Sequence, residues 1–442
     1  MIKYITNNRL LFIGVHILIG FLSTFSWFPK IFGIAIVVIS AIIVFISSNK
    51  NEEAFILAAY IVGAEVFIRM TKGFILYETG KYGVILLLVI GIIKGVFKQK
   101  FAIQYVFYLL LLALGVVLTQ VPYGESIRKA VVFNLSGPVV LGIAAIYFYL
   151  RPITKEQLFN ALFFMLLPLF SMVTYLYFRT PDLKELVFNT EANFQTSGGF
   201  GPNQVATAIG LGIFIIITFM LVKRKISGFL LLDVLFLIYF IFRGLLTFSR
   251  GGILSGVIAI FIFSFFYLLY QKGSLKIMFK YLVTGIVITF AIWMYTSNIT
   301  EGMLDNRYAG KNARGVEKKD ITTGRAGIIK DQLNSFIVQP LGIGVGNGKY
   351  KRQLDNENQL TAASHNEIGR LLEEHGVIGL IILIGLLTVP LFNFWFSNNY
   401  QRGFIIAFYV LWFLTINHSA MRIAFPGFIY ALSLIIITDE EA

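Results

Sequence analysis

The residues best suited to chemistry in this chain are His365-Asn366, followed nine residues later by Gly376-Val377-Ile378-Gly379. They stand where the longest polar stretch of an otherwise apolar chain gives way to a hydrophobic run. Histidine is the only side chain whose unperturbed pKa, about 6.5, suits proton transfer near neutral pH. Two of the four His residues, His365 and His375, lie in this segment. We therefore expect a base at the mouth of a membrane bundle, acting on a lipid-borne substrate.

A helix is predicted directly after His365. Ser364 is a plausible N-cap, Glu367 follows three positions later, and Gly376 suits the residue after the helix. On such a helix His365 and His375 would lie about 15 Å apart, so they could not share one metal ion. The bland alternative is that His365 only supports the helix start.

A second candidate site is Phe248-Ser249-Arg250-Gly251-Gly252, with Arg243 seven residues earlier. If one helix carries both arginines, their guanidinium groups share a face. Arginine in a bilayer is costly and is usually paired or functional, and a planar guanidinium fits a phosphate group. The two glycines would let a ligand approach the backbone. The alternatives are that Arg250 reaches lipid headgroups and that Arg243 pairs with Asp233.

The third candidate is Thr322-Thr323-Gly324-Arg325, ahead of a predicted helix that runs to about Val338 and is closed by Pro340. Either threonine could cap this helix, and free N–H groups at a helix start attract phosphate. Arg325 would stand in the first turn. The alternative is an ordinary cap with a solvated arginine.

Three further patterns receive structural interpretations. The glycine run from Leu341 to Gly348 follows no strand, so we expect a flexible turn rather than a dinucleotide site. Glu65 and Arg69 have the i, i+4 spacing of an internal ion pair. Gly198 to Asn203 is typical of a turn that re-enters the membrane, with Asn203 capping the next helix.

The composition is that of an integral membrane protein. Of 442 residues, 57% are hydrophobic and only 14% are charged, with a mean hydropathy of +0.78. A chain without cysteine has no disulfides, thiolate nucleophiles or Cys-ligated metals. The formal net charge of +14 indicates cytoplasmic Lys/Arg loops rather than nucleic-acid binding, because no basic run alternates with aromatic residues.

The predicted fold is all-α: a polytopic membrane helical bundle of about 12–14 transmembrane helices with one large external helical loop. The candidate spans are centred near Val15, Val38, Ala59, Val89, Leu110, Gly142, Phe170, Phe214, Phe236, Phe261, Ile286, Ile384, Tyr409 and Ala431. Residues 1–190 are predicted to be N-terminal transmembrane helices, and 191–296 transmembrane helices with the arginine motif. Residues 297–375 form the external loop, and 376–442 the C-terminal transmembrane helices.

The loop charges predict the orientation. With a cytoplasmic N-terminus, the Lys223-Arg224-Lys225 cluster faces inward, as the positive-inside rule favours, and the 297–375 loop faces outward. Within that loop, residues 298–362 hold ten Lys/Arg against seven Asp/Glu. This excess of positive charge suits an anionic ligand.

Taken together, these motifs resemble the bacterial O-antigen ligase and Wzy-type polymerase superfamily. The resemblance covers roughly residues 195–380 and rests on the order of five elements: Gly201-Pro202-Asn203, Ser249-Arg250-Gly251, Gly324-Arg325, Pro340 to Gly344, and His365-Asn366-x9-Gly376-x2-Gly379. Each motif alone is weak, and their order makes the resemblance fairly specific.

The resemblance implies transfer of a glycan from undecaprenyl diphosphate to an acceptor hydroxyl, with inversion and without metal or cofactor, outside the bacterial cytoplasmic (inner) membrane. It implies that His365 is the base or the group that orients the acceptor, and that Arg250 and Arg325 bind the diphosphate, with Asn366 beside them in the motif. A binding role for Arg243 is our own inference. The acceptor would be lipid A-core for a ligase or another glycan for a polymerase. The complete His motif favours the ligase pattern, and the sequence leaves both open.

A multi-span transporter or flippase of lipid-linked glycans is the alternative class. About fourteen spans would suit it. Transporters, however, tend to place polar groups at the membrane midplane on broken, repeated helices. Here the polar residues gather in an external loop, and no repeat relates two halves of the sequence.

Overall fold

The apolar runs of the sequence become helices in the computed structural model, which describes residues 1–95, 100–272, 275–320, 322, 324–355 and 364–439. The helices are α1 (Ile2–Asn7), α2 (Arg9–Leu22), α3 (Phe28–Ser47), α4 (Glu53–Met70), α5 (Thr79–Lys94), α6 (Ile103–Val117), α7 (Ile127–Phe148), α8 (Lys155–Arg179), α9 (Pro202–Leu221), α10 (Leu230–Leu246), α11 (Arg250–Gln271), α12 (Leu275–Ile299), α13 (Met303–Tyr308), α14 (Arg325–Val338), α15 (Asn347–Asp355), α16 (Glu367–Trp395), α17 (Asn399–His418) and α18 (Ala424–Leu432). Two short strands, β1 (Pro152–Thr154) and β2 (Ile436–Thr438), pair in parallel.

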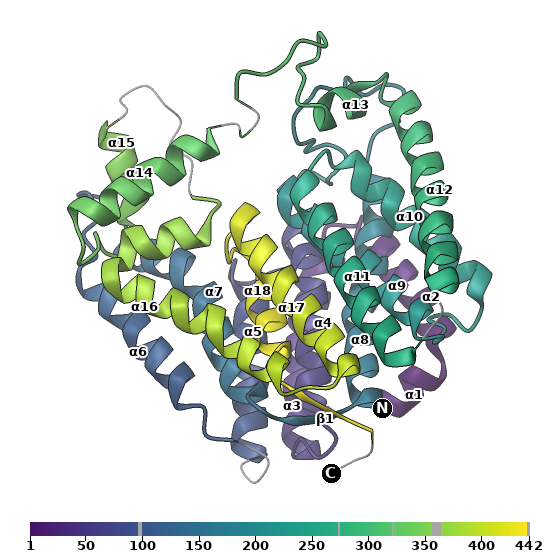
Figure 1. Ribbon diagram of the computed structural model, residues 1–442, viewed down its shortest axis with the longest axis horizontal. Coiled ribbons are helices and arrows are strands. Elements are labelled where there is room, and N and C mark those ends of the chain that lie inside the picture. The colour runs from purple at the N-terminus through teal and green to yellow at the C-terminus, as the bar shows by residue number, and fades with distance from the viewer. Residues whose placement is uncertain (96–99, 273–274, 321, 323, 356–363, 440–442) are drawn as a thin grey trace.

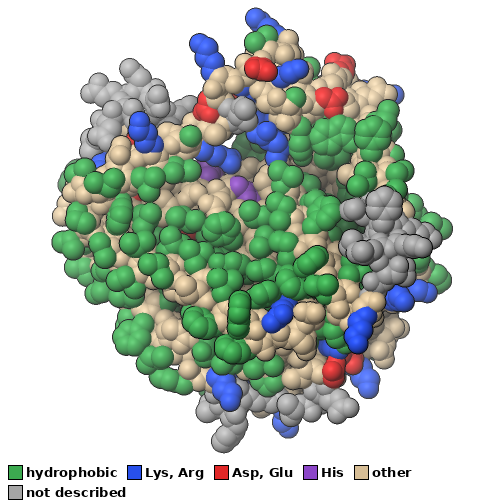
Figure 2. All heavy atoms as spheres, viewed as in Figure 1, with side chains coloured by type: hydrophobic (Ala, Val, Ile, Leu, Met, Phe, Trp, Pro, Cys, Tyr) green, Lys and Arg blue, Asp and Glu red, His purple; other side chains and the backbone are tan. Residues whose placement is uncertain are grey.

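The predicted all-α membrane fold is confirmed. Each predicted span centre lies inside one of the helices α2–α12 and α16–α18. Among the described residues, six helices are long and apolar enough to cross a membrane by length and composition: α3, α7, α8, α9, α11 and α16. The protein is therefore a multi-pass membrane protein. Hydrophobic side chains dominate the middle of the face shown in Figure 2, and Lys and Arg side chains gather toward its two ends.

The polar part of the chain lies at one end of the bundle. In Figure 1 both termini lie at the lower end, and α13, α14 and α15 lie at the opposite end. These three helices and the first turns of α16 form the large helical loop predicted over 297–375. The pairing of β1 with β2 joins the two halves of the chain at the end that holds the termini.

Glycines allow two helices of the central bundle to touch through their backbones. A Cβ added at Gly252 of α11 would meet the backbone of Ala206 and Thr207 of α9, and one at Gly210 would meet the carbonyl of Gly252. Small residues at helix interfaces are a common means of close packing in membranes. This contact fixes the N-terminal end of α11 against the N-terminal end of α9.

The predicted ion pair between Glu65 and Arg69 is also confirmed, with Arg69 Nη2 2.6 Å from Glu65 Oε1. The same Nη2 lies 3.0 Å from Glu78, which in turn pairs with Lys81 at 2.6 Å. Four buried charges of balanced sign thus connect α4 to the start of α5. A second buried pair, Arg151 with Glu52, closes the opposite end of α4.

Substituting Gly252→Ala should destabilise the protein by about 1–3 kcal/mol, because the added methyl group meets backbone atoms that cannot turn aside. The measurement is the unfolding transition in a detergent denaturation series. Gly285→Ala is the matched control, since a Cβ at Gly285 of α12 meets nothing within 4 Å. Equal stability of the two variants would contradict the close α9–α11 contact.

Candidate functional site

His365 lies in the loop between α15 and α16, and α15 lies at the end of the bundle opposite the termini (Figure 1). Its ring is half-buried, and among the described residues no hydrogen bond holds it. Burial, followed by the smaller effects of Arg325, Arg422 and His418, lowers the pKa of His365 to about 4. The imidazole is therefore neutral at pH 7 and able to accept a proton.

The N-cap of the following helix is Asn366 rather than Ser364. The Asn366 Oδ1 accepts a hydrogen bond from the Gly369 amide at 2.7 Å, and its Nδ2 donates to Asn417 Oδ1 at 2.9 Å. The Ser364 hydroxyl instead bonds to the Asn366 backbone. The prediction of a Ser364 cap is wrong because the helix begins two residues later than expected. Both ends of the Asn366 amide thus position the segment that carries His365.

The glycines of the His motif shape α16. Gly376 has φ +58° and ψ −135°, which interrupts the helix, and Val377 donates to the carbonyl of Pro340 at 2.8 Å. A Cβ at Gly376 would collide with that carbonyl, and one at Gly379 would collide with the carbonyl of Leu371. The predicted helix end at Gly376 is therefore a kink, where a polar segment meets the membrane segment of the same helix.

Arg250 does not share a helix with Arg243. The chain leaves α10 after Leu246, turns through Phe248 with φ +55°, and begins α11 at Arg250. The expectation of one continuous helix face for both arginines is therefore wrong, because the turn redirects the chain between them. Arg250 Nη1 donates to the carbonyl of Arg307 at 3.4 Å, which points it toward the external loop.

The two glycines after Arg250 pack against neighbouring protein, so they do not serve the approach of a ligand to the backbone. A Cβ at Gly251 would meet the His418 ring, and Gly252 admits the backbone of α9. The N-cap of α9 is Gly201, so the prediction that Asn203 caps this helix is wrong. Asn203 instead accepts a hydrogen bond from the Ser249 hydroxyl at 2.8 Å. The Gly-Pro-Asn and Ser-Arg-Gly motifs are thus two sides of one helix junction.

Arg325 is the first residue of α14, which ends at Val338 as predicted. The N-cap of α14 is Gly324, so the prediction of a Thr322 cap is wrong; the Thr322 hydroxyl, two residues before the cap, still accepts from the Ala326 amide at 3.2 Å. Thr323, the other predicted cap, lies outside the described residues. Burial lowers the pKa of Arg325, and the charge of Arg250 lowers it as well. Among the described residues, no hydrogen bond or ion pair holds this half-buried guanidinium.

Arg307 of α13 completes the group, and sequence motifs did not indicate it. Its Nε donates to the carbonyl of Phe248 at 3.1 Å, and its Nη1 to the carbonyl of Thr190 at 3.0 Å. Burial lowers the pKa of Arg307, followed by the charges of Arg250 and Arg325. Its only signal in the sequence was membership of a positively charged loop.

We call Arg250, Arg307 and Arg325 the arginine cluster. Its members come from α11, α13 and α14, and each lies close enough to another to perturb it electrostatically. On the face shown in Figure 2, Lys/Arg and His side chains border a hollow below the upper edge of the molecule. Such a concentration of half-buried guanidinium groups next to a neutral imidazole suits an anionic substrate with a reacting centre beside it.

Arg243 is not part of this cluster. It is 3% exposed, and its Nη2 donates to the Thr180 hydroxyl at 2.7 Å and to the Thr196 carbonyl at 3.1 Å. Asp233, its predicted partner, instead accepts from the amides of Ile226 and Ser227. Arg243 thus holds the loop between α8 and α9, which also supplies the Thr190 carbonyl to Arg307.

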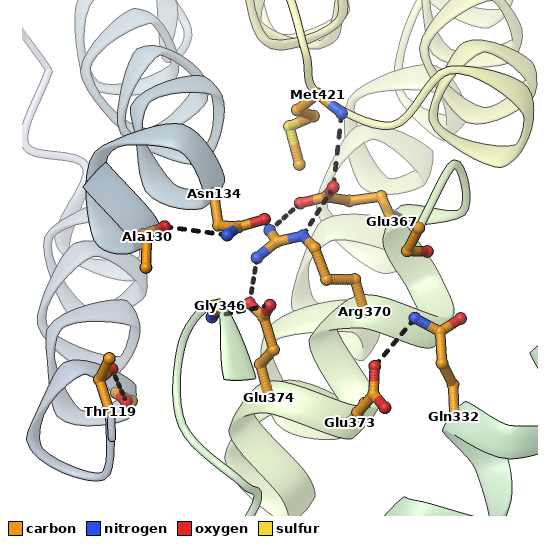
Figure 3. A network of polar contacts seen from close by, with 12 residues as sticks. Thr119, Ala130, Asn134, Gln332, Gly346, Glu367, Arg370, Glu373, Glu374 and Met421 are labelled. Carbon is orange, nitrogen blue, oxygen red and sulfur yellow. Dashed lines mark hydrogen bonds and ion pairs between the residues drawn. The ribbon is translucent and has the colours of Figure 1, made fainter. Parts of the chain in front are cut away.

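A buried polar network fixes the first turns of α16. Arg370 pairs with both Glu367 and Glu374, and Glu374 also accepts from the Gly346 amide at 2.9 Å (Figure 3). On the same helix Glu373 accepts from Gln332 of α14 at 3.2 Å. Because α14 carries Arg325, this second contact sets one member of the arginine cluster relative to the helix that follows His365.

The glycine turn after α14 belongs to the same framework. The amides of Ile343 and Gly344 donate to the carbonyls of Glu373 and Glu374, and Val345 donates to the carbonyl of Gly115. Gly342, Gly344 and Gly346 all have positive φ. The expectation of a flexible turn is corrected: it is bonded along its length to α16 and α6.

Replacing Arg370 with Met should destabilise the protein by about 3–5 kcal/mol, because two buried carboxylates lose their partner. Lys155→Met is the control, since its ion pair with Asp439 is solvent-exposed and exposed pairs contribute about 0–1 kcal/mol. Denaturation in detergent measures both variants. A similar, small effect of the two substitutions would show that the network does not hold α16.

Comparison with known proteins gives one match. Residues 234–384 match the model of a family described as O-antigen ligase. No curated protein and no solved structure matches the chain. The matched segment contains the whole arginine cluster and His365. Among the described residues, no group of three or more His, Asp or Glu side chains is arranged to hold a metal ion.

Proposed function

We propose that this chain is an O-antigen ligase-like glycosyl-transfer protein of the membrane and that its donor is a glycan linked to undecaprenyl diphosphate. The observation that carries the proposal is that Arg250, Arg307 and Arg325, from three separate helices, lie close to one another, and that Arg325 also lies close to the neutral imidazole of His365. Three guanidinium groups match a diphosphate in charge and in hydrogen-bonding geometry. A neutral imidazole matches the need for a base.

The diphosphate of the donor binds to the arginine cluster, and its polyprenyl chain remains in the membrane. Negative charge grows on the diphosphate as its bond to the sugar breaks. Arginines already fixed by carbonyl contacts, as Arg307 is by Phe248 and Thr190, stabilise that charge without rearranging. The arginine cluster therefore stabilises the leaving group. Fixed positive charges do this well in a partly dry site, because a low dielectric strengthens electrostatic interactions.

His365 acts on the other reactant. The acceptor hydroxyl oxygen forms a bond to the anomeric carbon while the bond between that carbon and the diphosphate oxygen breaks. The hydroxyl proton passes to the imidazole of His365, and undecaprenyl diphosphate leaves. One direct displacement inverts the configuration at the anomeric carbon. No step in this scheme uses a metal ion or a cofactor.

The membrane placement follows from the same scheme. We infer that the end of the bundle with α13–α15 faces outward from the bacterial cytoplasmic membrane. The Lys223-Arg224-Lys225 loop contacts the start of α2 near the N-terminus, where Arg9 donates to the Lys225 carbonyl, and positive loops favour the cytoplasmic side. The acceptor is either lipid A-core, for a ligase, or a second lipid-linked glycan, for a polymerase. Both acceptors present a hydroxyl group at this surface.

His365→Ala should lower the transfer rate about 10²–10⁴-fold, the usual contribution of a general base, without loss of folded protein. Purified protein in nanodiscs is given undecaprenyl-diphosphate-linked repeat units with and without lipid A-core, and the products are separated by size. A ladder without lipid A-core indicates a polymerase, and glycan found only on lipid A-core indicates a ligase.

His16→Ala is the matched control for this assay. His16 is also buried, and it contacts Tyr60 between α2 and α4. Full transfer by His365→Ala would contradict the role of His365 as base. Absence of product from wild-type protein with either acceptor would contradict the proposed function itself.

Arg325→Lys should impair transfer by raising the donor KM and lowering kcat, because an ammonium group cannot form the bidentate contact of a guanidinium with phosphate. Donor titrations with the same assay measure both constants. Arg314→Lys is the control, since Arg314 is an exposed arginine in the same external loop. Unchanged constants for Arg325→Lys would show that Arg325 is only a solvated helix-start residue.

A further inference from the structure

Arg422 lies in the loop of residues 419–423 between α17 and α18, outside the segment that matches the family. Its Nη2 donates to the carbonyl of Ser364 at 2.6 Å, directly before His365 in the chain. Its guanidinium also lies over the ring of Phe133, 4.2 Å from the centroid. Arg422 therefore contacts the peptide that sets the direction of the His365 side chain.

The loop that carries Arg422 is fixed from two sides. Arg69 of α4 donates to the Arg422 carbonyl at 3.0 Å, and Glu65 accepts from the Ala424 amide at 2.5 Å. From the other side, the Met421 amide donates to Glu367 of α16 at 3.4 Å (Figure 3). Two buried ion networks thus hold one short loop, so Arg422 has a defined place beside His365.

The Arg422 guanidinium places a positive charge near His365, and among the described residues no carboxylate forms an ion pair with this guanidinium. Its Nη1 is buried and has no hydrogen-bond partner among the described residues. Burial lowers the pKa of Arg422 to about 10, with Arg370 acting in the same direction and Glu367 in the opposite one. At neutral pH the group is still charged, and its charge opposes protonation of His365.

We propose that Arg422 is a positioning residue for His365, which fixes the Ser364 carbonyl and keeps the imidazole in its proton-accepting form before the donor binds. The proposal rests on the proposed function. It also gives a role to α4 and to loop 419–423, which lie outside the matched family segment.

The charges that face His365 come from three elements: Arg325 from α14, Arg422 from loop 419–423, and the His418 ring from α17. Among these, Arg325 also binds the donor in the proposed scheme. When the diphosphate occupies the arginine cluster, its negative charge offsets that of Arg325. The imidazole then becomes a stronger base when the substrate is in place, while Arg422 continues to hold its orientation.

The test compares full-length wild-type protein in nanodiscs with Arg422→Gln, Arg422→Lys and the control Arg402→Gln. Arg402 makes the same kinds of contact near the opposite end of α17, donating to the carbonyls of Phe394 and Trp395 and facing the Phe394 ring at 5.3 Å. The Arg402→Gln variant therefore measures how much transfer is lost when an arginine far from the site loses its contacts with carbonyl groups and an aromatic ring. Transfer is measured against pH, with donor and acceptor varied separately.

Arg422→Gln should lower kcat about 10²-fold, the cost of a misplaced catalytic group, with the donor KM unchanged. The acidic limb of kcat/KM should also move to higher pH. A base works only when unprotonated, so activity falls as the pH falls through the pKa of His365, which rises when a positive neighbour is removed. Arg422→Lys keeps the positive charge, so the acidic limb of its kcat/KM profile should not move, while its kcat should still fall. Arg402→Gln should change neither.

A second measurement does not depend on transfer. Imidazole ¹³C NMR of histidine-labelled protein without substrate follows the titration of His365, assigned by its absence in His365→Ala. Arg422→Gln should raise the midpoint, and Arg402→Gln should not. An unmoved midpoint, or a raised donor KM with an unmoved limb, would overturn the proposal. If wild-type protein makes no glycan product, the proposed function fails, and the NMR titration still decides whether Arg422 controls His365.

Discussion

The need of buried charges for partners of opposite sign governs how the helices of this protein are joined. An unpaired ion in a membrane interior is costly, so each buried ion in the bundle constrains the element that supplies its partner. Arg151 with Glu52, and Arg69 with Glu65 and Glu78, tie α4 to the ends of α7 and α5. These pairs set the frame in which the apolar surfaces of the helices pack.

The same need for partners of opposite charge distinguishes the arginines of the candidate site from the buried ion pairs that join the helices. Arg370 lies between two carboxylates, and its charge is fully used within the protein. Arg307 is held by two carbonyl oxygens and remains positively charged toward its surroundings. Carbonyl contacts fix a guanidinium in place without cancelling its charge. An arginine held in this way can still attract an anion, whereas an arginine in an ion pair cannot.

Framework and site are connected through short polar segments rather than through long helices. The Glu367–Arg370–Glu374 network, the Asn366 cap and loop 419–423 all converge on the three residues Ser364, His365 and Asn366. The His365 ring itself has no hydrogen-bond partner among the described residues, so its direction depends on the backbone these contacts hold. The residues on either side of His365 are held by these contacts.

The sequence alone determined the helices and the candidate residues of the site, because both depend on local patterns. Apolar runs placed all the predicted spans, and the residue order around Arg250, Arg325 and His365 pointed to glycosyl transfer. Only the tertiary structure showed the turn that separates Arg243 from Arg250, the Asn366 cap, and the contacts of Arg307 and Arg422. Arg422 reaches Ser364 across 58 residues, and Glu65 meets Ala424 across 359. Contacts between such distant positions leave no periodicity or spacing in the chain, so only packing of the helices, with their buried charges paired, decides them.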